Sequence, residues 1–204
     1  MQESKFSLPY YTEERWQNWV GKAKESNFKL DEEGKDDTGA GSVFVNMEDD
    51  VVLSCLKVIA KFDKELMSHE EALGNIIDIR EIVLNKIEPI NEDIDIMLES
   101  TQLSLMGVFA SCECYLDKAF EKTKSLDKLV KSAVSAEKDN NMGEALAQVA
   151  QIGANIIAGG KIKDKAVEGV PDGFVAEWLD GIDSISAALV GDKSYRDDEP
   201  DTGK

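Results

Sequence analysis

Apolar residues recur at steps of three and four along most of this chain, and this spacing restricts its fold more than any other feature. The longest such run includes Ile94, Leu98, Leu105, Cys112 and Phe120. Residues at these steps share one face of an α-helix, whereas a β-strand needs alternation at every second residue. We therefore predict an all-α protein, an antiparallel helical bundle with additional amphipathic helices at its N- and C-terminal ends.

Changes in composition divide the chain into five segments. We expect an N-terminal amphipathic helix in residues 1–30, an acidic, glycine-rich linker in 31–45, a core helical bundle in 46–124, a C-terminal helical region in 125–190 and a disordered tail in 191–204. The connections inside the core segment are short, which favours antiparallel neighbours. We expect its three helices to form the hydrophobic core.

Capping residues predict where the helices begin. Thr12 is expected to cap a helix to about residue 26, Asn46 a helix over 47–67, and Ser68 with Glu71 a capping-box helix to about residue 88. Proline in the first turn and glycine beyond the last predict a final helix over residues 171–190. In the capping box, the serine and the glutamate satisfy backbone donors of the first turn reciprocally.

Three further helices are predicted over residues 92–122, 126–138 and 142–158, the last one opened by the polar turn 139–141. The segment 142–158 is rich in alanine and glycine, including Gly153. Small residues permit close helix packing, but glycine also weakens a helix. The sequence therefore leaves two possibilities for this segment, a tightly packed helix and a marginally stable one.

The charge of the chain excludes two classes of partner. Its 41 acidic and 23 basic residues give a net charge of -18. Such a chain repels phosphate backbones and anionic lipid head groups, so we expect no direct binding of nucleic acid or membranes. No apolar run approaches the roughly 20 residues of a membrane span. We expect a cytoplasmic protein.

The residues that most often carry chemistry have structural explanations here. The single histidine, His69, is at the second position of the capping box, where an exposed side chain is expected. The three cysteines, Cys55, Cys112 and Cys114, lie in apolar helical patterns and are an odd number, which indicates packing in a reducing compartment. We therefore expect no catalytic residue and no cofactor, except under the alternative that follows.

Two pairs of acids provide the one metal-dependent alternative. Asp78 and Glu81 are three residues apart on one predicted helix, and Glu92 and Asp95 are three apart on the next. Acids at this spacing share a helix face, so the two pairs could chelate Mg²⁺ as in all-helical nucleotide pyrophosphohydrolases. Acids at the start of a helix also stabilise its dipole, which is the competing explanation for Glu92 and Asp95.

The first and last predicted helices are the candidate sites for binding a partner. Trp16, Trp19 and Val20 share one face of the first helix, and Phe174 and Trp178 share one face of the last. Packing within the chain explains these faces, and so does docking on another protein. We predict these five residues as the partner-binding set, for a protein partner or a homo-oligomer.

Three stretches carry a resemblance to a known family. They are the segment beginning Tyr11-Thr-Glu-Glu-Arg-Trp, the segment Asn46-Met-Glu-Asp-Asp-Val-Val, and residues 72–84 with their Asp78-Ile-Arg-Glu-Ile-Val-Leu run. The family that they resemble is DUF2150, an uncharacterised archaeal family. The resemblance covers roughly residues 10 to 120. It implies an archaeal, cytoplasmic source and brings no activity, cofactor or catalytic residue with it.

Three functions follow as hypotheses. The leading one is a non-enzymatic protein-interaction or scaffold role. The first alternative is a Mg-dependent, nucleotide pyrophosphohydrolase-like enzyme using the paired carboxylates. The second is an acidic factor that binds a basic surface, such as one on the ribosome.

Overall fold

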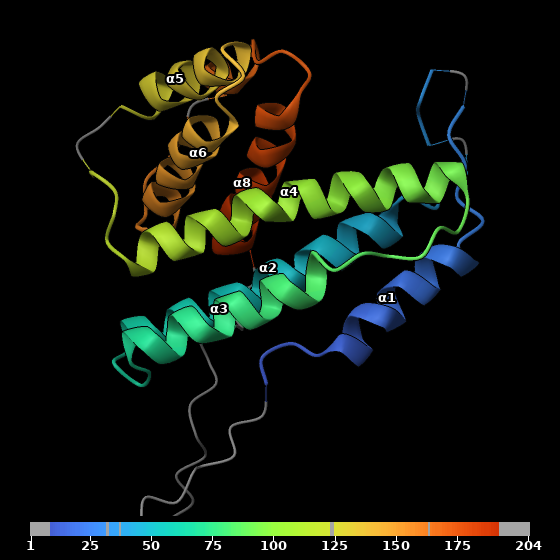
Figure 1. Cartoon of the computed structure of the whole chain (residues 1–204), viewed down its shortest axis with the longest axis horizontal. Helices are drawn as coiled ribbons and strands as arrows, with labels where there is room; N and C mark the ends of the chain where they lie inside the picture. Colours follow the sequence, from blue (N-terminus) through green and yellow to red (C-terminus); the bar gives the residue numbers. More distant parts are fainter. Residues whose placement is uncertain (1–8, 32, 37, 123–124, 163, 192–204) are drawn as a thin grey trace, which may run out of the picture.

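The computed structural model describes residues 9–31, 33–36, 38–122, 125–162 and 164–191, and in these residues it confirms the all-α prediction (Figure 1). The helices are α1 (Glu13–Glu25), α2 (Ser42–Asp63), α3 (His69–Val83), α4 (Glu92–Leu116), α5 (Leu126–Lys138), α6 (Met142–Ile157), α7 (Asp164–Val167) and α8 (Phe174–Val190). In the described residues, Leu30 and Asp36 form an isolated antiparallel β-bridge. The predicted tail lies outside the described residues, apart from Gly191.

Helix α4 is the centre of the fold. It contacts α2 and α3 on one side and α6 and α8 on the other, and α2, α3 and α4 run antiparallel in chain order (Figure 1). One cluster of buried side chains runs through both halves. The core is therefore not restricted to the three helices α2, α3 and α4, because α6 and α8 also supply fully buried residues such as Ile152 and Ile185.

The predicted caps at Thr12, Ser68 and Asn141 are confirmed. Thr12 Oγ1 accepts from the N–H of Arg15 at 3.2 Å, and Asn141 Oδ1 accepts from the N–H of Glu144 at 3.3 Å. Ser68 forms the complete capping box with Glu71. Each cap satisfies backbone donors of the first turn that have no partner inside the helix.

The predicted start of α2 is wrong. This helix begins at Ser42, and Asn46 lies inside it instead of capping it. The cause is Asp36, whose carboxylate accepts from the N–H groups of Thr38, Gly39 and Gly41 at 2.9, 2.8 and 2.7 Å. These donors lower the pKa of Asp36, and the turn that they form leads directly into α2.

The predicted ends of α2 and α4 are too late, because non-glycine residues adopt the left-handed conformation that stops each helix. Glu65 has φ 57° and Lys118 has φ 54°. After each of them, a backbone N–H reaches back to the last turn, from Leu66 to Lys61 O at 2.9 Å and from Ala119 to Cys114 O at 3.0 Å. Helix α3 also ends early, at Val83, whose carbonyl accepts from Gln102 Nε2 at 2.6 Å.

Glycines bring the C-terminal helices close to α4. A Cβ on Gly153 would lie 2.0 Å from Ser111 Oγ, and one on Gly181 would lie 2.4 Å from the carbonyl oxygen of Ser104. Helix α6 is therefore tightly packed, which resolves the alternative left open for residues 142–158. None of the described helices has the length and apolar content needed to cross a bilayer.

Candidate functional site

The structure does not bring the two acid pairs predicted from the sequence together into one cluster of described side chains. Asp78 and Glu81 are exposed on α3, because Ile76, Ile79 and Val83 form the buried face of that helix. Within the described residues, no three His, Cys, Asp or Glu side chains are placed so that they could hold a metal ion.

The other pair has the capping role that its position suggests. Glu92 is exposed in the first turn of α4, and Asp95 Oδ1 accepts from the N–H of Ile90 at 2.9 Å. Both acids also lie where the positive end of the helix dipole favours them. The helix dipole is therefore the structural explanation for Glu92, and for Asp95 the hydrogen bond from Ile90 is added to it.

Most of the predicted partner-binding residues lie inside the fold. Trp16, Val20 and Trp178 are buried, with 1%, 9% and 3% of their surface exposed. Trp19 is half-buried, and Phe174 is 50% exposed beside Trp178, with ring centroids 6.0 Å apart. Of the five, Phe174 therefore presents the most surface to a partner.

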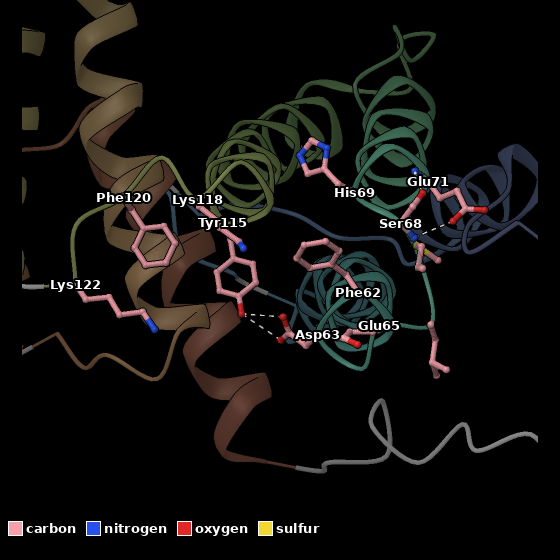
Figure 2. A pocket seen from close by; sticks show the side chains of 12 residues that line it. Phe62, Asp63, Glu65, Ser68, His69, Glu71, Tyr115, Lys118, Phe120 and Lys122 are labelled. Carbon is pink, nitrogen blue, oxygen red and sulfur yellow. Dashed lines mark hydrogen bonds between the residues drawn. The ribbon is translucent and has the colours of Figure 1, made fainter.

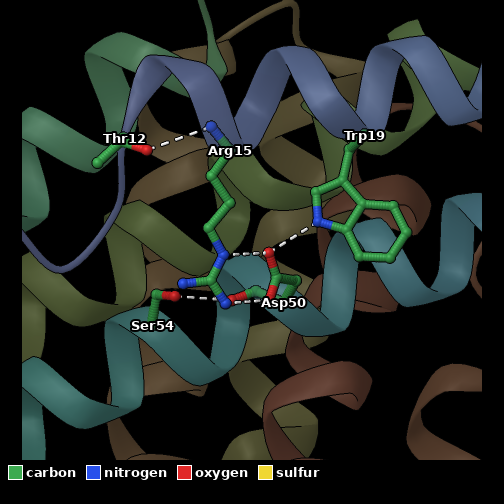
Figure 3. Close-up of polar contacts among 5 residues, drawn as sticks. All are labelled: Thr12, Arg15, Trp19, Asp50 and Ser54. Atoms are coloured by element: carbon green, nitrogen blue, oxygen red, sulfur yellow. Dashed lines mark hydrogen bonds and ion pairs between the residues drawn. The ribbon is translucent and has the colours of Figure 1, made fainter.

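A polar clamp holds α1 against α2 (Figure 3). Asp50 on α2 accepts from Arg15 through both guanidinium nitrogens Nε and Nη2, with Nε at 2.8 Å, and from Trp19 Nε1 at 2.8 Å. The Arg15 guanidinium also lies 5.2 Å from the centroid of the Tyr11 ring. This clamp accounts for the positions of Arg15 and Trp19 on α1, since both side chains donate to Asp50.

A large cavity lies elsewhere, where the α2–α3 turn meets the C-terminal end of α4 (Figure 2). It has a volume of about 930 Å³ and is open to solvent on one side. We call it the aromatic cleft. It is lined by Phe62, Asp63, Glu65, Leu66, Met67, Ser68, His69, Glu71, Tyr115, Lys118, Phe120 and Lys122.

Three aromatic rings form the walls of the aromatic cleft. Tyr115 and Phe120 are stacked, with centroids 5.8 Å apart and planes 19° apart, and Phe62 meets His69 edge-on at 6.4 Å. Leu66 at the rim is 62% exposed. An apolar surface of this kind beside a cavity is typical of a binding site.

Several polar side chains of the aromatic cleft make hydrogen bonds with one another or with residues next to the cleft. The Tyr115 hydroxyl donates to the Asp63 carboxylate at 2.9 Å, and burial together with this carboxylate raises the pKa of Tyr115 to about 12. His69 Nε2 lies 2.8 Å from Asp117 Oδ1, and Ser68 and Glu71 are engaged in the capping box. His69 is exposed, as the sequence predicted. These contacts fix the positions of the Tyr115, Asp63 and His69 side chains in the aromatic cleft.

Helix ends create the aromatic cleft, which is why sequence reasoning missed it. The apolar run that includes Phe120 predicts one long helix over 92–122, but α4 stops at Leu116 and α2 stops at Asp63, before its predicted end. The left-handed residues Glu65 and Lys118 turn the chain there and bring the two ends together. No glycine marks either position, so the available signal was only the polar residues that follow each apolar run.

A second polar cluster lies between α2, α4 and α8. Glu48 Oε1 accepts from the hydroxyls of Ser104 at 2.9 Å and Ser184 at 2.7 Å, and Glu177 accepts from Ser100 at 2.7 Å. Burial raises the pKa of Glu48, and the nearby Asp180 raises it further. The cluster borders a cavity of about 120 Å³.

These features define a class, an all-α protein with an open aromatic cleft at the ends of two of its helices. A family model described as an uncharacterised protein conserved in archaea, DUF2150, matches residues 9–198. The chain belongs to this family. The match confirms the resemblance and extends it beyond residue 120 into the C-terminal helices. Neither the curated proteins nor the solved structures include a match to the chain.

Proposed function

We propose that this protein is a non-enzymatic interaction protein that recognises another protein through the aromatic cleft. The observation that carries the proposal is that the exposed Leu66 and the stacked rings of Tyr115 and Phe120 line the same open cleft. Aromatic residues around a pocket are the usual anchoring points of a protein interface. The three free cysteines support a reducing, cytoplasmic setting for this role.

The volume of the aromatic cleft supports an anchoring role. A cavity of about 930 Å³ can receive one or two large apolar side chains, and its open side leaves room for the rest of a partner. The scaffold around it is rigid, because the ends of α2 and α4 that form it continue into fully buried residues such as Val58 and Cys112. A preformed site of this kind limits the ordering entropy lost on binding.

A second candidate function rests on charge. The net charge of -18 and the unbalanced carboxylates of Glu48, Glu177 and Asp180 support an acidic factor that binds a basic protein surface. Such binding would weaken steeply as salt is added, because screening acts on exposed charges. Docking in the aromatic cleft would be much less sensitive to salt.

Affinity purification with paired variants tests the proposal. Leu66→Asp places a charge on the rim of the aromatic cleft, and Phe174→Asp places one on the most exposed residue of the predicted partner-binding set. Both side chains are at least half exposed, so neither change should unfold the chain. In an archaeon that encodes a family member, Leu66→Asp should lose the stoichiometric partner and Phe174→Asp should keep it. Loss with Phe174→Asp alone would refute the proposal.

A further inference from the structure

Three acids and two lysines are among the residues that line the aromatic cleft. Of the acids, Asp63 accepts from Tyr115 and Glu71 accepts from the N–H of Ser68 at 2.8 Å. The third acid, Glu65, lies at the α2–α3 turn. Neutral donors thus hold two of the three carboxylates in fixed positions, while the lysines lie on a different side of the cleft (Figure 2).

The two lysines of the aromatic cleft remain unpaired. The ammonium groups of Lys118 and Lys122 make no ion pair or hydrogen bond with the part of the chain that the structure describes, and both residues are exposed. Figure 2 shows them on the side of Tyr115 and Phe120, with Glu65 on the side of Phe62. An unpaired cationic edge therefore lies next to the stacked rings.

We infer that the aromatic cleft receives a segment of a protein partner in which an aromatic or branched apolar side chain stands beside a carboxylate. This inference rests on the proposed function. The apolar side chain fits against Tyr115 and Phe120, and the carboxylate pairs with Lys118 and Lys122. Apolar burial supplies the affinity, and the charge pair selects the partner.

The negative charge of the whole molecule does not oppose this local pairing. At physiological ionic strength the field of distant charges is screened within about 8 Å, so the groups lining the cleft decide what binds there. The net charge of -18 should slow the approach of an acidic segment. Added salt should therefore speed association, which is the opposite of the behaviour expected for a basic partner.

Two small probes that share the same indole group and differ in charge test the inference. N-acetyl-tryptophan carries a carboxylate, and N-acetyl-tryptophanamide is its neutral counterpart. Binding to the full chain can be followed by the NMR shifts of the Leu66 and Met67 methyl groups, which line the cleft. We expect the acid to bind at least five-fold more tightly than the amide. Equal affinity for the two probes, or no shift at these methyl groups, would overturn the inference.

Variants that remove lysine charges test whether Lys118 and Lys122 cause the preference for the acid. Replacing both Lys118 and Lys122 by Gln should bring the ratio of the two affinities close to one while leaving amide binding unchanged. The matched control replaces Lys128 and Lys131, two exposed lysines of α5, by Gln and should keep the wild-type ratio. If the control variant also binds the acid and the amide equally, the preference for the acid arises from the overall charge of the molecule, and the inference fails.

The two proposals fail in different ways. If Leu66→Asp loses the partner but the probes bind equally, the cleft is the docking site and the inference about the carboxylate is wrong. If the acid binds preferentially and yet Leu66→Asp keeps the partner, the cleft binds such groups and the proposed function is wrong.

Discussion

Glu48 and Asp50 lie two residues apart on α2, yet their surroundings differ. Asp50 accepts from the Arg15 guanidinium and from Trp19, so a cation balances its charge. Glu48 accepts only from the hydroxyls of Ser104 and Ser184, and its nearby charged groups are the acids Asp49 and Asp180. The pKa of Glu48 is raised, mainly because burial removes the carboxylate from water.

The raised pKa makes the stability of the protein depend on pH at this residue. Because folded Glu48 holds its proton more tightly than unfolded Glu48, its charged form opposes folding, and stability falls as pH rises through the raised pKa. Glu48→Gln should remove this dependence and be more stable than wild type at pH 7. Chemical denaturation between the ordinary glutamate pKa and neutrality measures it. A variant less stable than wild type at pH 7 would contradict the assignment.

At the scale of helices, close approach to α4 determines how the C-terminal half packs. Gly153 on α6 and Gly181 on α8 occupy places where a Cβ would collide with α4, at Ser111 and Ser104. By contrast, a Cβ on Gly74 in α3 would meet nothing within 4 Å. The same residue type therefore serves two different purposes in this fold.

Substitution by alanine should change the free energy of unfolding in opposite directions at Gly153 and Gly74. Gly153→Ala should lower the free energy of unfolding by about 1–3 kcal/mol, because the added methyl overpacks the contact with Ser111. Gly74→Ala should raise it by about 0.5–1 kcal/mol through helix propensity alone. Urea unfolding of both variants provides the comparison. Equal effects of the two changes would show that the contact between α6 and α4 is looser than described.

Docking of α1 on α2 depends on Asp50. Asp50→Ala leaves Arg15 and Trp19 Nε1 without their acceptor and should lower the free energy of unfolding by about 1–3 kcal/mol. The loss should be toward the low end of this range, because the Arg15 side chain is 46% exposed. Hydrogen exchange should accelerate in α1 and remain slow in α4. The exposed neighbour Asp49, changed to Ala, is the control, and unchanged exchange in α1 of Asp50→Ala would contradict the clamp.

At the scale of the whole molecule, features that depend on local contacts could be predicted from the sequence, and features that depend on tertiary contacts could not. Thr12, Ser68 and Asn141 begin helices through contacts with residues three positions away, so their sequences predict them. The apolar spacing likewise predicts the all-α class. The aromatic cleft depends on the meeting of two helix ends that are far apart in the chain. Glu65 and Lys118, which set those ends, carry no signal in a single sequence because glycine usually takes that conformation.

Charge is the other property of the whole molecule with a measurable consequence. At a net charge of -18, repulsion among the acids opposes the compact state. The free energy of unfolding should therefore rise as salt increases from about 0.1 M to about 1 M, where the Debye length falls from about 10 Å to about 3 Å. A series of denaturation curves at neutral pH measures it. Stability that falls with salt would mean that attractive ion pairs such as Arg15–Asp50 outweigh the repulsion.

The central claim is that the aromatic cleft is the recognition site. Hydrogen exchange of the chain in complex with its purified partner, compared with the free chain, tests it most directly. Protection should concentrate in residues 62–71 and 115–122, which line the cleft. Protection confined instead to the surface around Glu48, Glu177 and Asp180 would contradict the claim and favour a basic partner.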